Sequence, residues 1–145
     1  DVTEMRERIA KQYPTRNPWA LKHVRGGMVD MDFIAQYIVL RHAPENPLLW
    51  HRSARQVFES AQTDGLLDVE ITRPLIEAKK FLSDLISLLR LSAPGGLITD
   101  DAPMGLKNLL VKGMRMHSYD ALKEHVLRLE HNVTQVYAQM VRGDL

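Results

Sequence analysis

Apolar residues recur along most of the chain with the spacing of an α-helix, and no useful length shows the strict alternation of a half-buried strand. Six stretches carry the helical pattern. They cover residues 4–13, 28 to about 42, 51 to about 63, 69–91, a short run between Pro103 and Gly113, and a last run from Ser118 to Gly143. The pattern therefore predicts an all-α fold.

The two longest stretches are amphipathic, each with one apolar stripe at alternating spacings of three and four. Residues 28–42 are apolar nearly all round, which predicts a central helix packed on several sides. Such helices can bury their stripes only against each other, so we expect an antiparallel helical bundle, with a four-helix-bundle-like core and additional short helices. The predicted core-facing stripes are Ile71, Leu75, Ala78, Leu82, Leu85 and Leu89, then Tyr119, Leu122, Val126, Leu129, Val133, Val136 and Met140.

Composition limits the partners that this chain can have. Its 145 residues suit one helical domain, 1–145, with one core. Lys and Arg number 19 against 18 Asp and Glu, and a net charge of +1 argues against broad binding of nucleic acid or of an anionic membrane. We therefore expect no nucleic-acid partner and no membrane partner.

The chain also lacks several signals of location. It has no cysteine, which suits a reducing compartment. It has no apolar run near the ~20 residues of a membrane span, and its first residues lack the apolar stretch of a signal peptide. We expect a cytoplasmic protein. Because the sequence opens without methionine and with charges already at helical spacing, we expect a piece of a longer protein.

The most informative segment is residues 22–36, where Gly26 and Gly27 precede an apolar helix that carries Asp30 and Asp32. A helix that only filled a core would not place two acids there, because burying an unpaired carboxylate costs several kcal/mol. One interpretation is a site for a nucleotide or phosphorylated ligand, with the glycine amides at a helix N-terminus and Lys22 and Arg25 just upstream as counter-charges. The other is a capped helix start with local ion pairs. We favour the second, because helix ends are capped far more often than they bind ligands.

Evidence for a metal or nucleotide site within this chain is weak. Asp30 and Asp32 lie about 200° apart around a helix, so they cannot both face one ion. No phosphate-binding glycine loop and no nucleophile elbow is present. The methionines Met104, Met114 and Met116 are more easily explained as core filling than as a contact surface. Six histidines show neither a zinc-binding helix motif nor an i, i+4 pair, so no metal site is expected: His23, His42, His51, His117, His125 and His131.

The segment from Leu21 to Tyr37 closely resembles a signature of the glutamine synthetase adenylyltransferase family, whose pattern is Lys-x-x-x-Gly-Gly-x-x-Asp-x-Glu-Phe-x-x-Gln. The corresponding residues here are Lys22, Gly26, Gly27, Asp30, Asp32, Phe33 and Gln36. The resemblance extends from Met5-Arg6-x-Arg8-Ile9 to Ala102-Pro-x-Gly105-Leu-x-x-Leu109-Leu110 and the final long helix. One position departs from the family pattern: Asp32 stands where the family has Glu, so its carboxylate is one methylene shorter.

This resemblance implies a role. Members have two halves, each a nucleotidyltransferase domain followed by a helical domain, and Asp30 is typical of the second half, which attaches AMP to glutamine synthetase. The chain would be the C-terminal fragment of that multidomain enzyme. ATP and magnesium would bind in the upstream domain, whose carboxylates activate attack by a glutamine synthetase tyrosine on the α-phosphorus. The parent protein would be an enzyme, and this fragment alone would not be catalytic.

The same resemblance implies site residues and partners. Lys22, Gly26, Gly27, Asp30, Asp32 and Gln36 would form an edge toward the upstream nucleotidyltransferase domain or its nucleotide. Expected partners are that domain, glutamine synthetase and the signalling protein PII. The alternative is a non-catalytic regulatory docking module that binds PII or glutamine. A free-standing interaction bundle with an accidental motif match is the third possibility.

Overall fold

The chain folds entirely into helices and connections within residues 2–145, the part described by the structure, which is a computed structural model. This confirms the predicted all-α fold. None of the described helices is both long and apolar enough to cross a membrane. The helices are α1 (Val2–Gln12), α2 (Met28–His42), the 3₁₀ helix η1 (Pro47–His51), α3 (Ala54–Thr63), α4 (Val69–Ser92), the 3₁₀ helix η2 (Pro94–Gly96), α5 (Met104–Gly113) and α6 (Tyr119–Val141).

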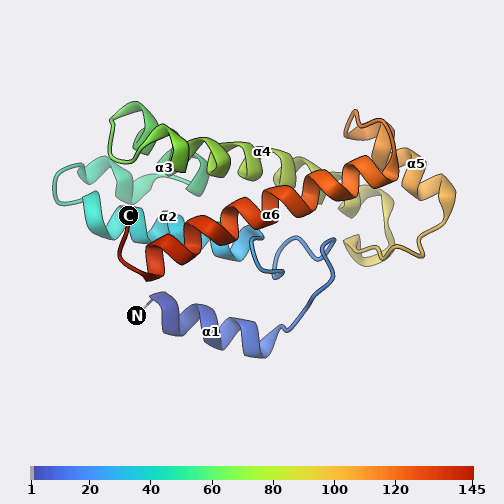
Figure 1. Ribbon diagram of the computed structural model, residues 1–145, viewed down its shortest axis with the longest axis horizontal. Coiled ribbons are helices and arrows are strands. Elements are labelled where there is room, and N and C mark those ends of the chain that lie inside the picture. Colours follow the sequence, from blue (N-terminus) through green and yellow to red (C-terminus); the bar gives the residue numbers. More distant parts are fainter. Residues whose placement is uncertain (1) are drawn as a thin grey trace.

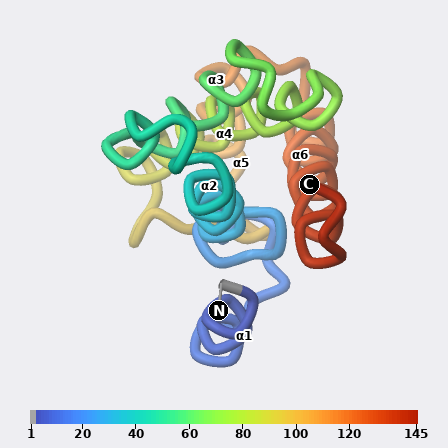
Figure 2. Tube along the Cα trace, turned by 90° about the vertical axis from the view of Figure 1, so that its left-hand side faces the viewer, coloured from blue at the N-terminus to red at the C-terminus, as the bar shows by residue number. Residues whose placement is uncertain are grey.

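Helices α2, α3, α4 and α6 form the bundle that the sequence predicts. The two longest, α4 and α6, run in opposite directions, and α2 packs against both of them and against α3 (Figure 1). Helix α5 covers one end of the bundle. Viewed along its long axis, the bundle has α1 at its rim, where it packs against α2 (Figure 2). The first turn of α1 and the C-terminal residues lie at the same end of the molecule.

The apolar stripes form the core. All the predicted residues of α4 and α6 are buried except Ile71 and Tyr119, which are partly buried. Helix α2 is buried on several sides, as its all-round apolar pattern indicates. The prediction that the methionines fill the core is confirmed for Met114 and Met116, which pack against it. The prediction is wrong for Met104, which is 67% exposed.

The third helix begins later than the sequence pattern predicts. The expected helix from residue 51 is divided into η1, which ends at His51, and α3, which begins at Ala54. The cause is a capping box at Ser53. Its hydroxyl accepts the Gln56 amide at 3.3 Å, and the Gln56 side chain accepts the Ser53 amide at 2.9 Å.

Candidate functional site

The turn that leads into α2 needs glycine at two positions because backbone packs against it. Gly26 has φ +81°, and a Cβ placed on it would lie 1.9 Å from the carbonyl oxygen of Glu130 on α6. A Cβ on Gly27 would lie 2.2 Å from the carbonyl oxygen of Leu21. Any side chain at either position would push the turn away from its neighbours. The glycine pair is therefore explained by close backbone contact.

The amides of this turn are already used within the chain. Gly26 N–H donates to Asp30 Oδ2 at 2.6 Å, and Gly27 N–H donates to the carbonyl of Val24 at 2.9 Å. The next amide, of Met28, donates to the carbonyl of Leu21 at 2.8 Å. The geometry matches the capped-helix interpretation, since an anion would find neither glycine amide free.

Asp30 is buried in an ion pair with α1. Its Oδ1 accepts from Arg6 Nε, and both side chains are only 1% exposed. Arg6 Nη2 also donates to the carbonyl of His23 at 3.4 Å. With the Gly26 amide on its other oxygen, the Asp30 carboxylate is compensated from two sides. This pair joins α1, the turn and α2.

Asp32 lies on the opposite side of α2 from Asp30, as the predicted 200° separation requires. It is 63% exposed, and its Oδ1 lies 3.8 Å from Lys79 Nζ on α4. Gln36, one turn further along α2, is also exposed, and so is Lys22. The six predicted site residues thus divide into a buried group that builds the turn (Gly26, Gly27 and Asp30) and an exposed polar group (Lys22, Asp32 and Gln36).

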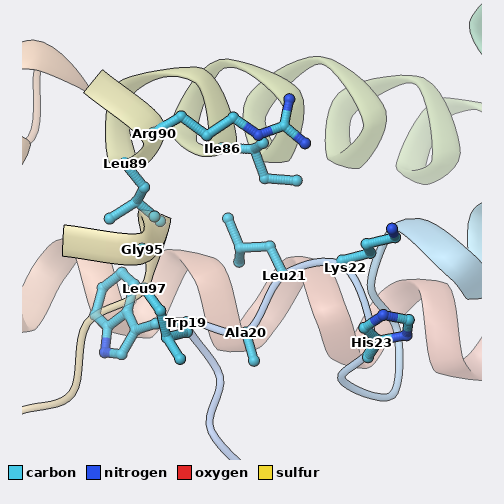
Figure 3. Close-up of a pocket in the computed structure, with 11 residues that line it drawn as sticks. Trp19, Ala20, Leu21, Lys22, His23, Ile86, Leu89, Arg90, Gly95 and Leu97 are labelled. Atoms are coloured by element: carbon cyan, nitrogen blue, oxygen red, sulfur yellow. The ribbon is translucent and has the colours of Figure 1, made fainter. Parts of the chain in front are cut away.

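A groove runs beside the exposed group, between the segment Trp19–His23 and the last turns of α4 (Figure 3). Its first hollow has a volume of about 280 Å³. Trp19, Leu89 and Leu97 lie at one end, whereas the charged ends of Lys22 and Arg90 lie toward the other (Figure 3). This hollow therefore has an apolar end and a cationic end.

A second hollow of about 270 Å³ continues from the cationic end and shares Lys22, Ile86 and Arg90 with the first. It adds Ser83 and Ser87 of α4, together with Met28, Val29 and Asp32 of α2. Within residues 2–145, neither Lys22 nor Arg90 forms a salt bridge. We call the two hollows together the α2–α4 groove.

A hydrogen-bonded cluster around Asp100 holds the apolar end of this groove in place. Its carboxylate accepts from Trp19 Nε1 at 3.3 Å and from the Tyr119 hydroxyl at 2.6 Å, and it forms an ion pair with Lys123. Lys123, the hydroxyl and the indole hold the pKa of Asp100 well below its usual value. The Trp19 ring also stacks on Tyr119, with centroids 5.4 Å apart. The loop before α5 is thereby tied to α6.

No group of three histidine or acidic residues in the described part of the chain could hold a metal ion. His23 stacks on Tyr13 with ring centroids 4.4 Å apart, and His125 packs edge-on against Phe81. The described residues therefore contain no ready-made cluster of three ligands for a metal ion. Any magnesium that the family resemblance implies would need ligands from another domain.

Three residues of this region were not singled out as site residues from the sequence. Arg6 was one charge among several in the first helix, although it lies three residues before Ile9 and within the segment Met5-Arg6-x-Arg8-Ile9 that resembles the family. Arg90 follows Leu89 in the last turns of α4, and it belongs to no recognisable motif. Glu130 is 5% exposed, burial raises its pKa to about 8, and its Oε2 has no hydrogen-bond partner. The available signal was its position on the apolar stripe of α6, four residues after Val126 and three before Val133.

The chain is similar to curated enzymes of one kind. It is 33% identical over 147 aligned positions, 99% of its length, to the bifunctional glutamine synthetase adenylyltransferase/adenylyl-removing enzyme of Rhodopseudomonas palustris. It is 30% identical to the enzyme of that name from Xanthobacter autotrophicus and 32% to that from a Bradyrhizobium strain, over 97% of its length in both cases. No family model matches the chain.

The alignments cover nearly the whole helical chain but only one segment of each relative. The chain is homologous to one segment of the glutamine synthetase adenylyltransferases, which confirms the resemblance of the glycine-pair signature. It spans about 14% of the length of these relatives.

Proposed function

We propose that this chain is the helical domain that accompanies the nucleotidyltransferase domain of a glutamine synthetase adenylyltransferase, in its AMP-attaching half. The observation that carries the proposal is the division of the signature into buried and exposed residues. Gly26, Gly27 and Asp30 fix the turn through contacts within the chain, while Lys22 and Asp32 line the same hollow at the surface. A signature needed only for folding would not account for the exposed polar residues.

The exposed residues suit a contact with a neighbouring domain. Gln36 and Asp32 are four residues apart on α2, so their side chains project from one face. Buried contacts on the opposite side of the helix hold that face in place. An edge of one cation, one carboxylate and one amide can form directional hydrogen bonds with a catalytic domain and fix its orientation. Gly26, Gly27 and Asp30 would position this edge from within.

The parent reaction would be transfer of AMP from ATP to a tyrosine of glutamine synthetase, in cytoplasmic nitrogen regulation. ATP and magnesium would bind in the nucleotidyltransferase domain, as the family resemblance implies. This chain would contribute orientation of that domain and would perform no chemical step. The names of the relatives and the coverage of the chain support this assignment.

The test replaces the exposed edge in the full-length parent enzyme. Asp32→Ala combined with Gln36→Ala should lower the rate of glutamine synthetase adenylylation by roughly tenfold or more, because misorientation is costly in transfer reactions. The melting temperature should stay unchanged, because both side chains are exposed. Lys112→Ala combined with Asp120→Ala, two exposed residues away from the edge, is the matched control. Unchanged adenylylation in the edge variant would refute the proposed contact.

The regulatory alternative is tested with the same variants. If the edge is a docking site for PII or for glutamine, the edge variant should lose the response to these effectors and keep its unregulated rate. NMR spectra of this chain titrated with PII or with glutamine provide the direct measurement. Shifts confined to residues around Lys22 and Asp32 would favour the alternative over the contact with a catalytic domain.

A further inference from the structure

We propose that the α2–α4 groove binds an acidic peptide segment with a large apolar side chain, supplied by the neighbouring domain of the same polypeptide. The inference rests on the proposed function for the source of the segment. It assigns a further surface and a new residue, Arg90, which the family signature does not include. The signature contributes only Lys22 to the cationic part of the groove.

The charge of the groove selects an anionic occupant. Lys22 and Arg90 line both hollows, and neither has a salt-bridge partner among the described residues. The one acid of the groove, Asp32, already has Lys79 at 3.8 Å. Two cations without a salt-bridge partner, one on each wall at the same end of the groove, raise the local concentration of carboxylates.

The apolar end requires more than a free anion. Trp19, Leu21 and Leu89 form a sealed floor, each 2% exposed or less, whereas Leu97 at the rim is 47% exposed. A half-exposed leucine beside an apolar floor gains from contact with another apolar side chain. The occupant therefore combines an apolar side chain at the Leu97 end with a carboxylate at the Arg90 end.

The shape of the groove favours an extended peptide over a small molecule. Small ligands are usually held in deep pockets that cover most of their surface. Here the buried side chains close the floor, so a ligand would lie on the surface along α4. From Ser83 to Arg90 the helix rises about 10 Å at about 1.5 Å per residue. An extended chain covers that distance with about three residues. The glycine amides that would suit a phosphate are occupied by Asp30 and Val24.

The decisive experiment is photo-crosslinking in the full-length parent enzyme. A benzophenone amino acid replaces Leu97, and the crosslinked peptides are identified by mass spectrometry. We expect a crosslink to an acidic segment of the same polypeptide. A benzophenone at Leu127, 45% exposed on α6 and outside the groove, is the matched control and should not give that product.

Charge reversal then tests the cationic end. Arg90→Glu should lower the yield of the Leu97 crosslink by roughly fivefold or more. In the protein that keeps Arg90, added salt should also lower the crosslink yield. Arg55→Glu, at an exposed arginine of α3, is the control and should leave the yield unchanged. A yield unaffected by Arg90→Glu, a product with a non-acidic segment, or a product only with another protein would overturn the proposal.

The two proposals fail separately. Loss of the Leu97 crosslink in Arg90→Glu, together with normal adenylylation in the Asp32 and Gln36 variant, would retain the groove and refute the edge contact. The reverse result would retain the edge contact and refute the peptide groove.

Discussion

At the scale of single residues, the glycine pair shows how a family signature can record packing. Gly26 faces the backbone of α6, and the nearest atoms to its missing Cβ are the carbonyl oxygen, carbonyl carbon and Cα of Glu130. None of these can rotate away as a side chain could. Glycine is required here by another helix, so a bound phosphate is not needed to explain it.

Gly26→Ala should therefore be strongly destabilising. It adds a clash with backbone to the cost of a positive φ, so the loss should exceed the ~1–2 kcal/mol of a left-handed residue alone. Thermal unfolding followed by circular dichroism measures the effect. Gly105→Ala is the control, because Gly105 lies in α5 with nothing within 4 Å of a Cβ, and it should be neutral or slightly stabilising. Equal melting temperatures for the two variants would contradict this account.

Glu130 gives the protein a specific pH dependence. Burial raises its pKa from 4.5 to about 8 in the folded state, so between these values the folded chain binds more protons than the unfolded chain. Stability should fall as pH rises through this window, by up to a few kcal/mol at about 1.4 kcal/mol per unit. Glu130→Gln, neutral at every pH, should lose this dependence. The measurement is the urea midpoint of both proteins at pH 5, 7 and 9, and midpoints that move in parallel would refute the assignment.

At the scale of elements, α1 is attached differently from the rest of the bundle. The long helices are held by continuous apolar stripes, whereas α1 contacts α2 and has one fully buried polar anchor, Arg6. Ile9 is its partly buried apolar contact. Helix α1 is held by the buried Arg6–Asp30 pair, by an exposed Glu7–Arg25 pair and by little apolar area, so it should open more readily than the core helices.

Arg6→Met should release α1 while the core bundle remains folded. The amides of α1 should exchange with solvent much faster, and the uncompensated Asp30 should cost about 3–5 kcal/mol of stability. Hydrogen exchange and urea unfolding provide the measurements. The double variant Arg6→Met with Asp30→Asn removes the unpaired charge and should recover part of the loss. Arg8→Met, at an exposed residue of the same helix, should change neither quantity.

At the scale of the whole molecule, periodicity predicted the bundle because its core is made of regular stripes such as Leu75, Leu82 and Leu89. The same reasoning could place Asp30 and Asp32 on opposite faces of α2. It could not find the partner of Asp30, because Arg6 is 24 residues away and helical geometry fixes only near neighbours. Arg90 and Trp19 were brought to one groove by tertiary packing, for which the sequence has no local signal.

The first turn of α1 and the residues after α6 lie at the same pole of the bundle (Figure 1). The α5 end, with the loop tied down by Asp100, lies at the other end of the bundle. The apolar end of the α2–α4 groove, with Trp19 bonded to Asp100, therefore lies away from the pole that holds the first turn of α1.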